Sequence, residues 1–165
     1  MTSTIDDQPE RAGEPDRIIL VMIDHKQLTD EHNELGAIAL QLRGFVTRQV
    51  ADIEAVTRER WRLGYRLAIH LAREDRHVYP ELKRHTDAQI AAMATTYEAE
   101  MGNLDQQYRD YMARWNSDGI IAKWDSFCDE TLAILEALEN RIAREEKNLY
   151  PLLGRTGKAP MPARQ

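Results

Sequence analysis

Four side chains able to bind a cation stand where the helical pattern of the sequence calls for apolar residues. These are His25, His70, Glu74 and Glu145. His70 and Glu74 are four residues apart, so a helix presents them on one face, about 40° apart. Charged side chains are seldom buried without a partner, so polar residues in an apolar ladder are informative. We therefore take these four as the candidate functional residues.

Metal binding is the chemistry that would satisfy these side chains. An unpaired buried carboxylate costs several kcal/mol or takes up a proton and loses its charge. Two carboxylates and two imidazoles at one depth of a helical core need a cation between them. His nitrogens and carboxylate oxygens are suitable ligands for a divalent transition metal. We therefore expect a metal site formed by His25, His70, Glu74 and Glu145.

The segments that carry these residues have the periodicity of helices. Between residues 17 and 153, apolar side chains recur at alternating steps of three and four. No segment shows the period of two that a strand needs. Short connections make neighbouring helices antiparallel, so the pattern predicts an all-α, up-down four-helix bundle over residues 17–153.

Turn-forming residues predict where these helices begin and end. The predicted boundaries are a loop between Gly44 and Asp52, a helix end after Pro80, an N-cap at Thr86 and a turn at 116–119. Residues 1–16 are expected to form a disordered lead, and residues 154–165 a flexible C-terminal tail.

An internal repeat links the second helix to the fourth. Residues 70–82 align with residues 141–153, and six of the 13 positions are identical. The alignment pairs Glu74 with Glu145 and superimposes the two Tyr-Pro sequences. This pattern predicts a pseudo-twofold bundle whose equivalent residues face each other across the core.

Together these motifs resemble the hemerythrin, or HHE cation-binding, family of four-helix bundles. The matching pieces are Asp-His on the first helix, His-x-x-x-Glu-Asp with Tyr-Pro on the second, and Glu-Glu with Leu-Tyr-Pro on the fourth. The resemblance implies that His25, His70, Glu74 and Glu145 hold non-haem iron. It implies a role in binding or sensing iron, O2, NO or peroxide, as in a stress response. Consumption of peroxide is the main enzymatic activity that the resemblance would allow.

Two positions depart from the family pattern and leave two interpretations open. Met101 and Arg141 stand where the family has His residues, and those imidazoles belong mainly to one of two irons. In the first interpretation one metal ion remains, with Arg141 lining the vacated half. In the second, the guanidinium of Arg141 bridges Glu74 and Glu145 by bidentate hydrogen bonds. The chain would then be a metal-free interaction module that acts through a protein partner.

Composition excludes several other functions. The 165 residues include 22 Lys and Arg and 28 Asp and Glu, and this net charge of −6 argues against nucleic-acid binding. The longest apolar run, residues 18–23, is far shorter than the about 20 residues that cross a membrane. A single cysteine, Cys128, excludes an internal disulfide and a Cys-based metal cage. We expect a cytoplasmic protein, for which homodimerisation is compatible but not specified.

The remaining polar residues are expected to have structural roles. His32 lies one heptad, about 10 Å, beyond His25 on the same helical face, too far to share its site. We expect it to pack in the core, with Tyr108 as a candidate hydrogen-bond partner. Tyr79 and Tyr150 are expected to cap one end of the bundle. A solvated face is expected from Arg58, Arg60, Arg62 and Arg66.

Overall fold

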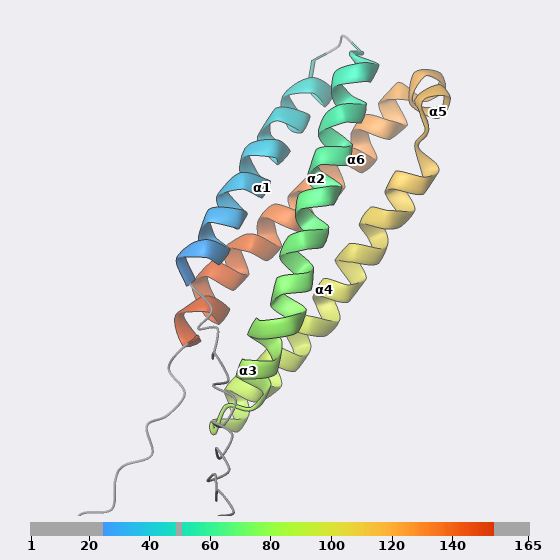
Figure 1. Ribbon diagram of the computed structural model, residues 1–165. Coiled ribbons are helices and arrows are strands. Elements are labelled where there is room, and N and C mark those ends of the chain that lie inside the picture. Colours follow the sequence, from blue (N-terminus) through green and yellow to red (C-terminus); the bar gives the residue numbers. More distant parts are fainter. Residues whose placement is uncertain (1–24, 49–50, 154–165) are drawn as a thin grey trace, which may run out of the picture.

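The long helices of the described chain lie side by side in the structure (Figure 1). The computed structural model describes residues 25–48 and 51–153, and that part of the chain contains no strand. The long helices are α1 (His25–Val46), α2 (Ile53–Arg73), α4 (Ala88–Arg114) and α6 (Trp124–Arg144). The predicted all-helical bundle is confirmed. The predicted lead at 1–16, the start of the bundle at 17–24 and the tail at 154–165 lie outside the described residues.

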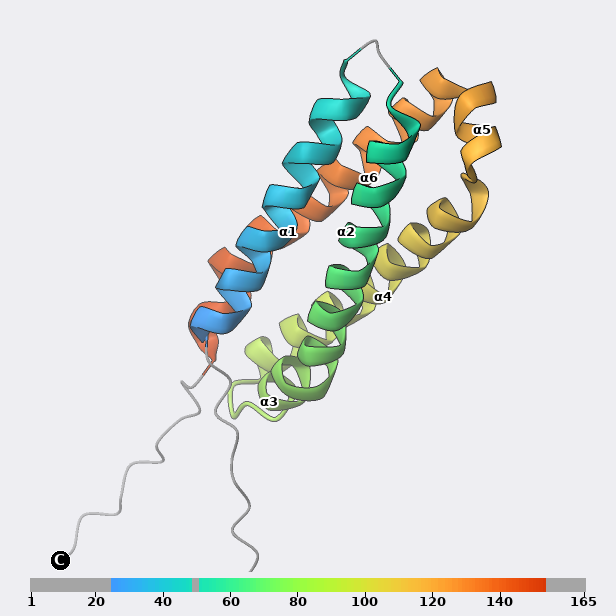
Figure 2. The ribbon, with the colours of Figure 1, turned by 45° about the horizontal axis from the view of Figure 1, so that its top comes forward.

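Short helical segments complete the fold. Two π-helical turns, η1 (Glu74–Val78) and η2 (Glu145–Leu149), follow α2 and α6, and they continue into α3 (Tyr79–Lys83) and η3 (Tyr150–Leu152). The turn predicted at 116–119 instead begins a further helix, α5 (Ser117–Ala122). In Figure 2, the beginning of α1 and the end of α6 lie together at one end of the bundle.

The helix beginnings follow from their capping side chains. The Asp52 carboxylate accepts the Ala55 N–H at 2.9 Å and so caps α2, within the predicted loop. The N-cap of α4 is Asp87, which accepts the Gln89 N–H at 2.8 Å, rather than the predicted Thr86. Thr and Asp are both good N-caps, so their order in the sequence did not distinguish them.

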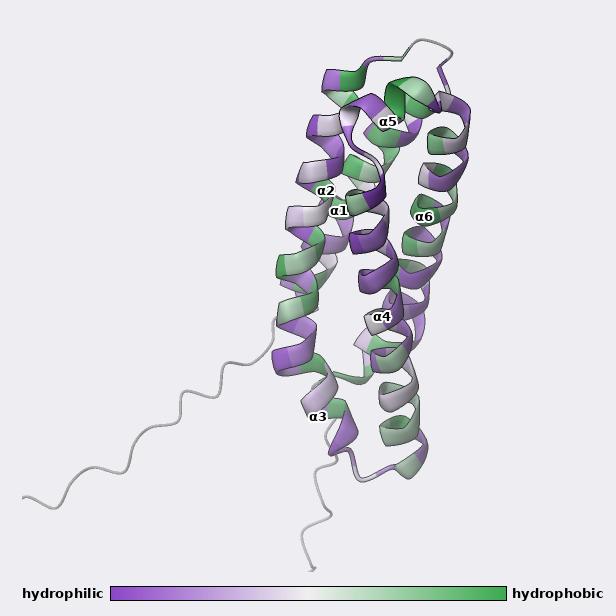
Figure 3. Cartoon of the chain, turned by 90° about the vertical axis from the view of Figure 1, so that its right-hand side faces the viewer, coloured by the Kyte–Doolittle hydropathy of each residue, from purple (hydrophilic) through white to green (hydrophobic). Residues whose placement is uncertain are grey.

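The bundle core consists of two apolar clusters with a polar layer between them. On α1, Leu35 belongs to the larger cluster and Leu28 to the smaller one, and His32 lies between them. In the same way, Leu138 of α6 belongs to the larger cluster and Leu149 of η2 to the smaller one, and Glu145 lies between them. Each helix carries both hydrophilic and hydrophobic residues, as an amphipathic helix must (Figure 3). The polar residues of the layer are thereby held at one depth of the bundle.

Arg60 contradicts the predicted solvated face, because its side chain is buried. Its guanidinium donates to the carbonyl oxygens of Trp115 at 2.9 Å and Tyr111 at 3.5 Å. These carbonyls end α4 and carry the negative end of its helix dipole, which compensates the buried charge. Tyr108 donates to the Arg60 carbonyl at 2.6 Å and therefore is not the expected partner of His32.

Helices α2 and α4 approach closely at Gly64. A Cβ atom at this position would lie 2.9 Å from Cε1 of Tyr108, so the approach requires glycine. Within the described residues, none of the helices has the length and apolar character needed to cross a membrane.

Candidate metal centre

Four buried side chains converge in the polar layer. His32, His70, Glu74 and Glu145 each offer one potential ligand atom, and these atoms all lie within 4.8 Å of one another. Both glutamates are fully shielded from solvent, and both histidines are nearly so. The ligands come from α1, the end of α2 and the first residues of the two π-helical turns. These four elements together contribute a compact donor set of two imidazoles and two carboxylates.

The π-helical turns give the two glutamates equivalent positions. The Tyr79 N–H donates to the Glu74 carbonyl, and the Tyr150 N–H donates to the Glu145 carbonyl, each five residues back. A π-helical turn widens a helix by one residue, and such turns are frequent at functional sites. The predicted repeat between residues 70–82 and residues 141–153 therefore extends to their backbone hydrogen bonds.

Each histidine is oriented by an outer carboxylate. Nδ1 of His32 lies 2.7 Å from Glu146, and Nδ1 of His70 lies 3.1 Å from Glu31. A carboxylate at Nδ1 holds a proton on that nitrogen and leaves the Nε2 lone pair available. The two Nε2 atoms face each other at 3.1 Å. Two lone pairs at this distance repel unless a cation or a proton lies between them.

The two glutamates differ in how their oxygens are satisfied. Oε1 of Glu74 accepts the Tyr150 hydroxyl at 2.7 Å, and Oε1 of Glu145 accepts Nε of Arg141 at 2.6 Å. Oε2 of Glu145 is buried and has no hydrogen-bond partner in the part of the chain that the structure describes. The Nε2 atom of His32 lies 3.3 Å from it. A buried carboxylate oxygen left open beside two inward-facing imidazoles fits a metal ion.

Burial and neighbouring charges shift the pKa values of Glu74, His70 and His32 in the metal-free layer. Burial, and then the charge of Glu145, raise the pKa of Glu74 to about 8. Burial, together with the charges of His32 and Arg141, lowers the pKa of His70 to about 3. Burial also lowers the pKa of His32, but Glu145 and Glu146 outweigh it and the net shift is upward. Without metal, the layer therefore holds protons that a cation would displace.

Arg141 does not form the predicted bidentate bridge between the two glutamates. Its Nε donates to Glu145, but another guanidinium nitrogen donates to the Tyr79 hydroxyl at 2.6 Å. The Tyr79 hydroxyl lies 3.4 Å from both Glu74 and Glu145. Arg141 thus reaches Glu74 only through Tyr79. The third nitrogen contacts Glu100 at 3.4 Å, toward the surface.

The structure brings His70, Glu74 and Glu145 together and does not bring His25 to them. His25 is the exposed first residue of α1, and its ring packs edge-on against Tyr150 with centroids 5.7 Å apart. His32 occupies the position in the group that the sequence assigned to His25. Both residues lie on one face of α1, one heptad apart, so periodicity identified the face without fixing the depth.

Four further residues of the site were not predicted as functional. Glu31 and Glu146 orient the histidines, and Tyr79 and Tyr150 hydrogen-bond the glutamates. The doubled Tyr-Pro sequence was the available signal for the tyrosines. Glu146 belongs to the Glu-Glu pair of the family motif, but nothing in the sequence indicated a role for it or for Glu31, because acidic residues at the edge of a helical face are common on solvated surfaces.

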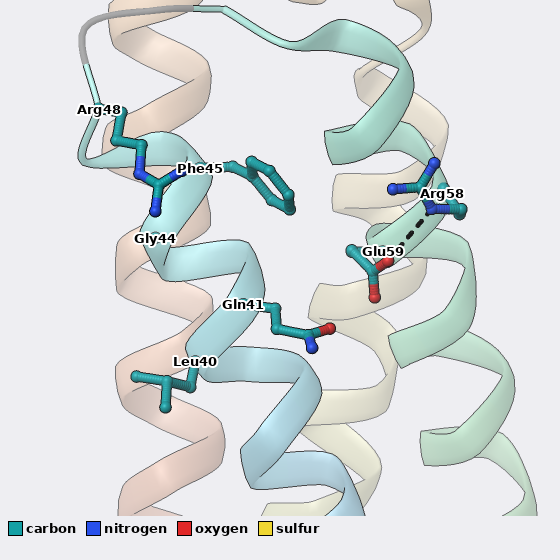
Figure 4. A pocket seen from close by; sticks show the side chains of 7 residues that line it. All are labelled: Leu40, Gln41, Gly44, Phe45, Arg48, Arg58 and Glu59. Carbon is teal, nitrogen blue, oxygen red and sulfur yellow. Dashed lines mark hydrogen bonds and ion pairs between the residues drawn. The ribbon is translucent and has the colours of Figure 1, made fainter.

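Two surface grooves differ in their relation to the site. One, with a volume of about 250 Å3, lies between α4 and α6 and has Arg141 in its lining. Another, of about 460 Å3, lies between α1 and α2 near the loop that joins them, where Phe45 of α1 extends toward α2 (Figure 4). None of the four clustered residues lines this second groove, so it does not lead to the site.

A family model for the hemerythrin HHE cation binding domain matches residues 24–153. The chain belongs to the hemerythrin HHE cation-binding family. Neither a curated protein nor a solved structure matches the chain. Cation binding, typically of iron, is what membership in this hemerythrin family implies, and the buried donor set of His32, His70, Glu74 and Glu145 could hold a metal.

Proposed function

We propose that this hemerythrin-family protein binds one iron ion through His32, His70, Glu74 and Glu145 and uses it to bind or sense O2, NO or peroxide. The observation that carries the proposal is Oε2 of Glu145, which is buried, has no hydrogen bond within the described residues and lies 3.3 Å from Nε2 of His32. It lies beside Nε2 atoms that have their opposite nitrogens held by carboxylates. A polar atom left unsatisfied in this way is costly in a metal-free protein.

A single ion is favoured by the position of Arg141. The guanidinium is always charged and cannot ligate metal, and it repels a nearby cation. Its bond to Glu145 at 2.6 Å occupies the oxygen that a second ion would need. Arg141 thus supplies positive charge in the half of the site that the sequence comparison expects to be vacated.

The surrounding residues would prepare the site for small ligands. Bound iron would supply a redox-active centre with room for an exogenous ligand. Glu31 and Glu146 hold the imidazoles in a binding orientation, and the apolar clusters on both sides exclude water. The groove that reaches Arg141 is the approach that the structure offers for a diatomic molecule or peroxide.

Elemental analysis of untagged protein from iron-supplemented medium tests the proposal. We expect about one iron per chain, and a Glu145→Gln variant that loses most of it. Titration of the ferrous protein with NO under argon should then change its visible spectrum in proportion to the iron content. About two irons per chain would contradict the role of Arg141, and zinc or manganese in place of iron would contradict the choice of metal.

The second candidate function is a metal-free module. It is supported by the Arg141–Glu145 ion pair, which already provides one of the two carboxylates with a cation. In that case anaerobic titration with Fe2+ would give no heat of binding, and the folded chain would be stable in EDTA. A search for protein partners would then replace the search for small ligands.

A further inference from the structure

The Tyr150 hydroxyl lies inside the donor set rather than beside it. Tyr150 is fully buried and begins η3, five residues after Glu145. Its hydroxyl donates to Oε1 of Glu74 at 2.7 Å and lies 3.1 Å from Nε2 of His32. The ring stacks on the His32 imidazole at a centroid distance of 5.0 Å, which fixes the direction of the hydroxyl.

The equivalent residue of the repeat, Tyr79, is placed differently. Its hydroxyl accepts a 2.6 Å hydrogen bond from Arg141 and lies 3.4 Å from each glutamate. The charged guanidinium of Arg141 therefore fixes the position of the Tyr79 oxygen. No arginine contacts the Tyr150 oxygen among the described residues, and its neighbours are two of the proposed ligand atoms.

The distances around the Tyr150 oxygen are close to those between neighbouring ligands of one ion. Transition-metal bonds to imidazole nitrogen and carboxylate oxygen are about 2.0–2.2 Å long. Adjacent ligand atoms at right angles on such an ion lie roughly 2.8–3.1 Å apart. The Tyr150 oxygen lies 2.7 and 3.1 Å from two ligand atoms, and the two Nε2 atoms lie 3.1 Å apart.

We propose that Tyr150 is a fifth ligand and binds ferric iron as a phenolate. The inference rests on the proposed iron site. On binding, the O–H bond of Tyr150 breaks, an oxygen–iron bond forms, and the proton leaves to solvent without any change in oxidation state. Glu74 then loses the hydrogen bond that Tyr150 donated to it and binds the same ion as the phenolate.

Spectroscopy of the ferric protein tests this inference. Metal-free protein is loaded with Fe3+ from its nitrilotriacetate complex, freed of excess iron and analysed for iron per chain. A phenolate ligand gives a charge-transfer band in the visible range and resonance-enhanced tyrosinate vibrations, both of which arise in the unmodified protein. We expect both signals. The Tyr150→Phe variant should lose them and retain most of its iron, whereas Tyr65→Phe, a control that alters an exposed tyrosine, should keep both the signals and the iron.

The outcomes separate this inference from the proposed function. About one iron per chain without tyrosinate vibrations would overturn the role of Tyr150 and leave the iron site intact. Loss of the signals in Tyr79→Phe but not in Tyr150→Phe would assign the ligand to the other half of the repeat, and so also overturn it. Absence of bound iron in the unmodified protein would overturn both. Because the unmodified protein already gives a decisive spectrum, the test does not depend on how Tyr150→Phe folds.

Discussion

Glu74 and Glu145 are the first residues of two π-helical turns, and both side chains point to the same buried group of histidines. The chain thus uses one local device twice: a carboxylate, a widened turn and a tyrosine five residues later. The environments of the two halves differ because Arg141 contacts Glu145 directly but reaches Glu74 through the Tyr79 hydroxyl. The asymmetry of a repeated motif is what favours one ion over two.

Replacing His25 and His32 in turn with alanine should distinguish the candidate ligand that the structure indicates from the one that the sequence predicted. His32→Ala removes an inward-facing Nε2, so we expect the affinity for Fe2+ to fall by more than about 100-fold, beyond the usual effect of an outer-shell residue. His25→Ala removes an exposed ring and should leave the affinity unchanged. Anaerobic calorimetry measures both. A comparable loss in His25→Ala would restore the original assignment.

The outer carboxylates should tune metal affinity without contacting the ion. Glu146→Gln removes the charge that orients Nδ1 of His32, and such changes cost about 10–100-fold in affinity. Glu139→Gln is the matched control, because Glu139 lies on α6 and, among the residues described, forms its ion pair with Arg43 at the surface. Competition with a chromogenic chelator gives both affinities. Equal affinities in the two variants would show that the carboxylate at Nδ1 has no such role.

Arg141 should stabilise the metal-free protein far more than its neighbour Arg144. Both side chains contact Glu100 and lie over the Tyr97 ring, but only Arg141 is buried against Glu145. Removing one partner of a buried ion pair costs about 3–5 kcal/mol. In urea unfolding with EDTA, Arg141→Met should lose on that order and Arg144→Met less than about 1 kcal/mol. Similar losses in both variants would argue against a buried charge network.

The stability of the metal-free protein should fall as pH rises from 6.5 to 8. Folded Glu74 keeps its proton up to about pH 8, whereas glutamate in the unfolded chain releases its proton near pH 4.5. The folded state therefore binds more protons in this window, and the free energy of unfolding decreases with pH. The raised pKa of His32 acts in the same direction, and the lowered pKa of His70 affects only pH values below 6.5.

One excess proton held by the folded state corresponds to a loss on the order of 2 kcal/mol across these 1.5 pH units. Urea midpoints in EDTA at several pH values measure it. Metal-loaded protein should show the opposite trend in apparent affinity, because the ion binds the deprotonated carboxylate and imidazoles. A metal-free stability that rises with pH would contradict the charge assignment.

Gly64 should be intolerant of a side chain, unlike other helical glycines. In Gly64→Ala, the added Cβ meets the Tyr108 ring at 2.9 Å and forces α2 and α4 apart, at a cost of about 1–3 kcal/mol. Gly36→Ala meets no atom within 4 Å and should stabilise α1 by about 0.5–1 kcal/mol. Thermal unfolding of the two variants should therefore shift in opposite directions.

The sequence predicted those features that depend on periodicity. The helical bundle followed from steps of three and four. The grouping of His70, Glu74 and Glu145 followed from their positions on core-facing ladders and from the repeat. That these residues bind metal stays a prediction.

Features that depend on depth along a helix, or on contacts between helices, could not be predicted. His25 and His32 share a face, and only the contacts of His32 with His70 of α2 and Glu146 of η2 select the deeper residue. Arg60 looked like a surface residue because its partners are backbone carbonyls at the end of α4, which no pattern of side chains reveals. The role of Glu31 and Glu146 in orienting the histidines could not be predicted for a similar reason, since their partners lie on other helices.

The beginning of α1 and the end of α6 lie together at one end of the bundle (Figure 2), and the site draws residues from α1 and from η2, which follows α6. His32 and Tyr150 contact each other there although they are 118 residues apart in the sequence. Proteases attack a folded protein when its segments separate locally and expose their backbone. An ion bound by His32 of α1 and Glu145 of η2 would link these two segments and oppose their separation. The supply of metal would then govern how often the first and last helices separate, and with it the lifetime of the protein in the presence of proteases.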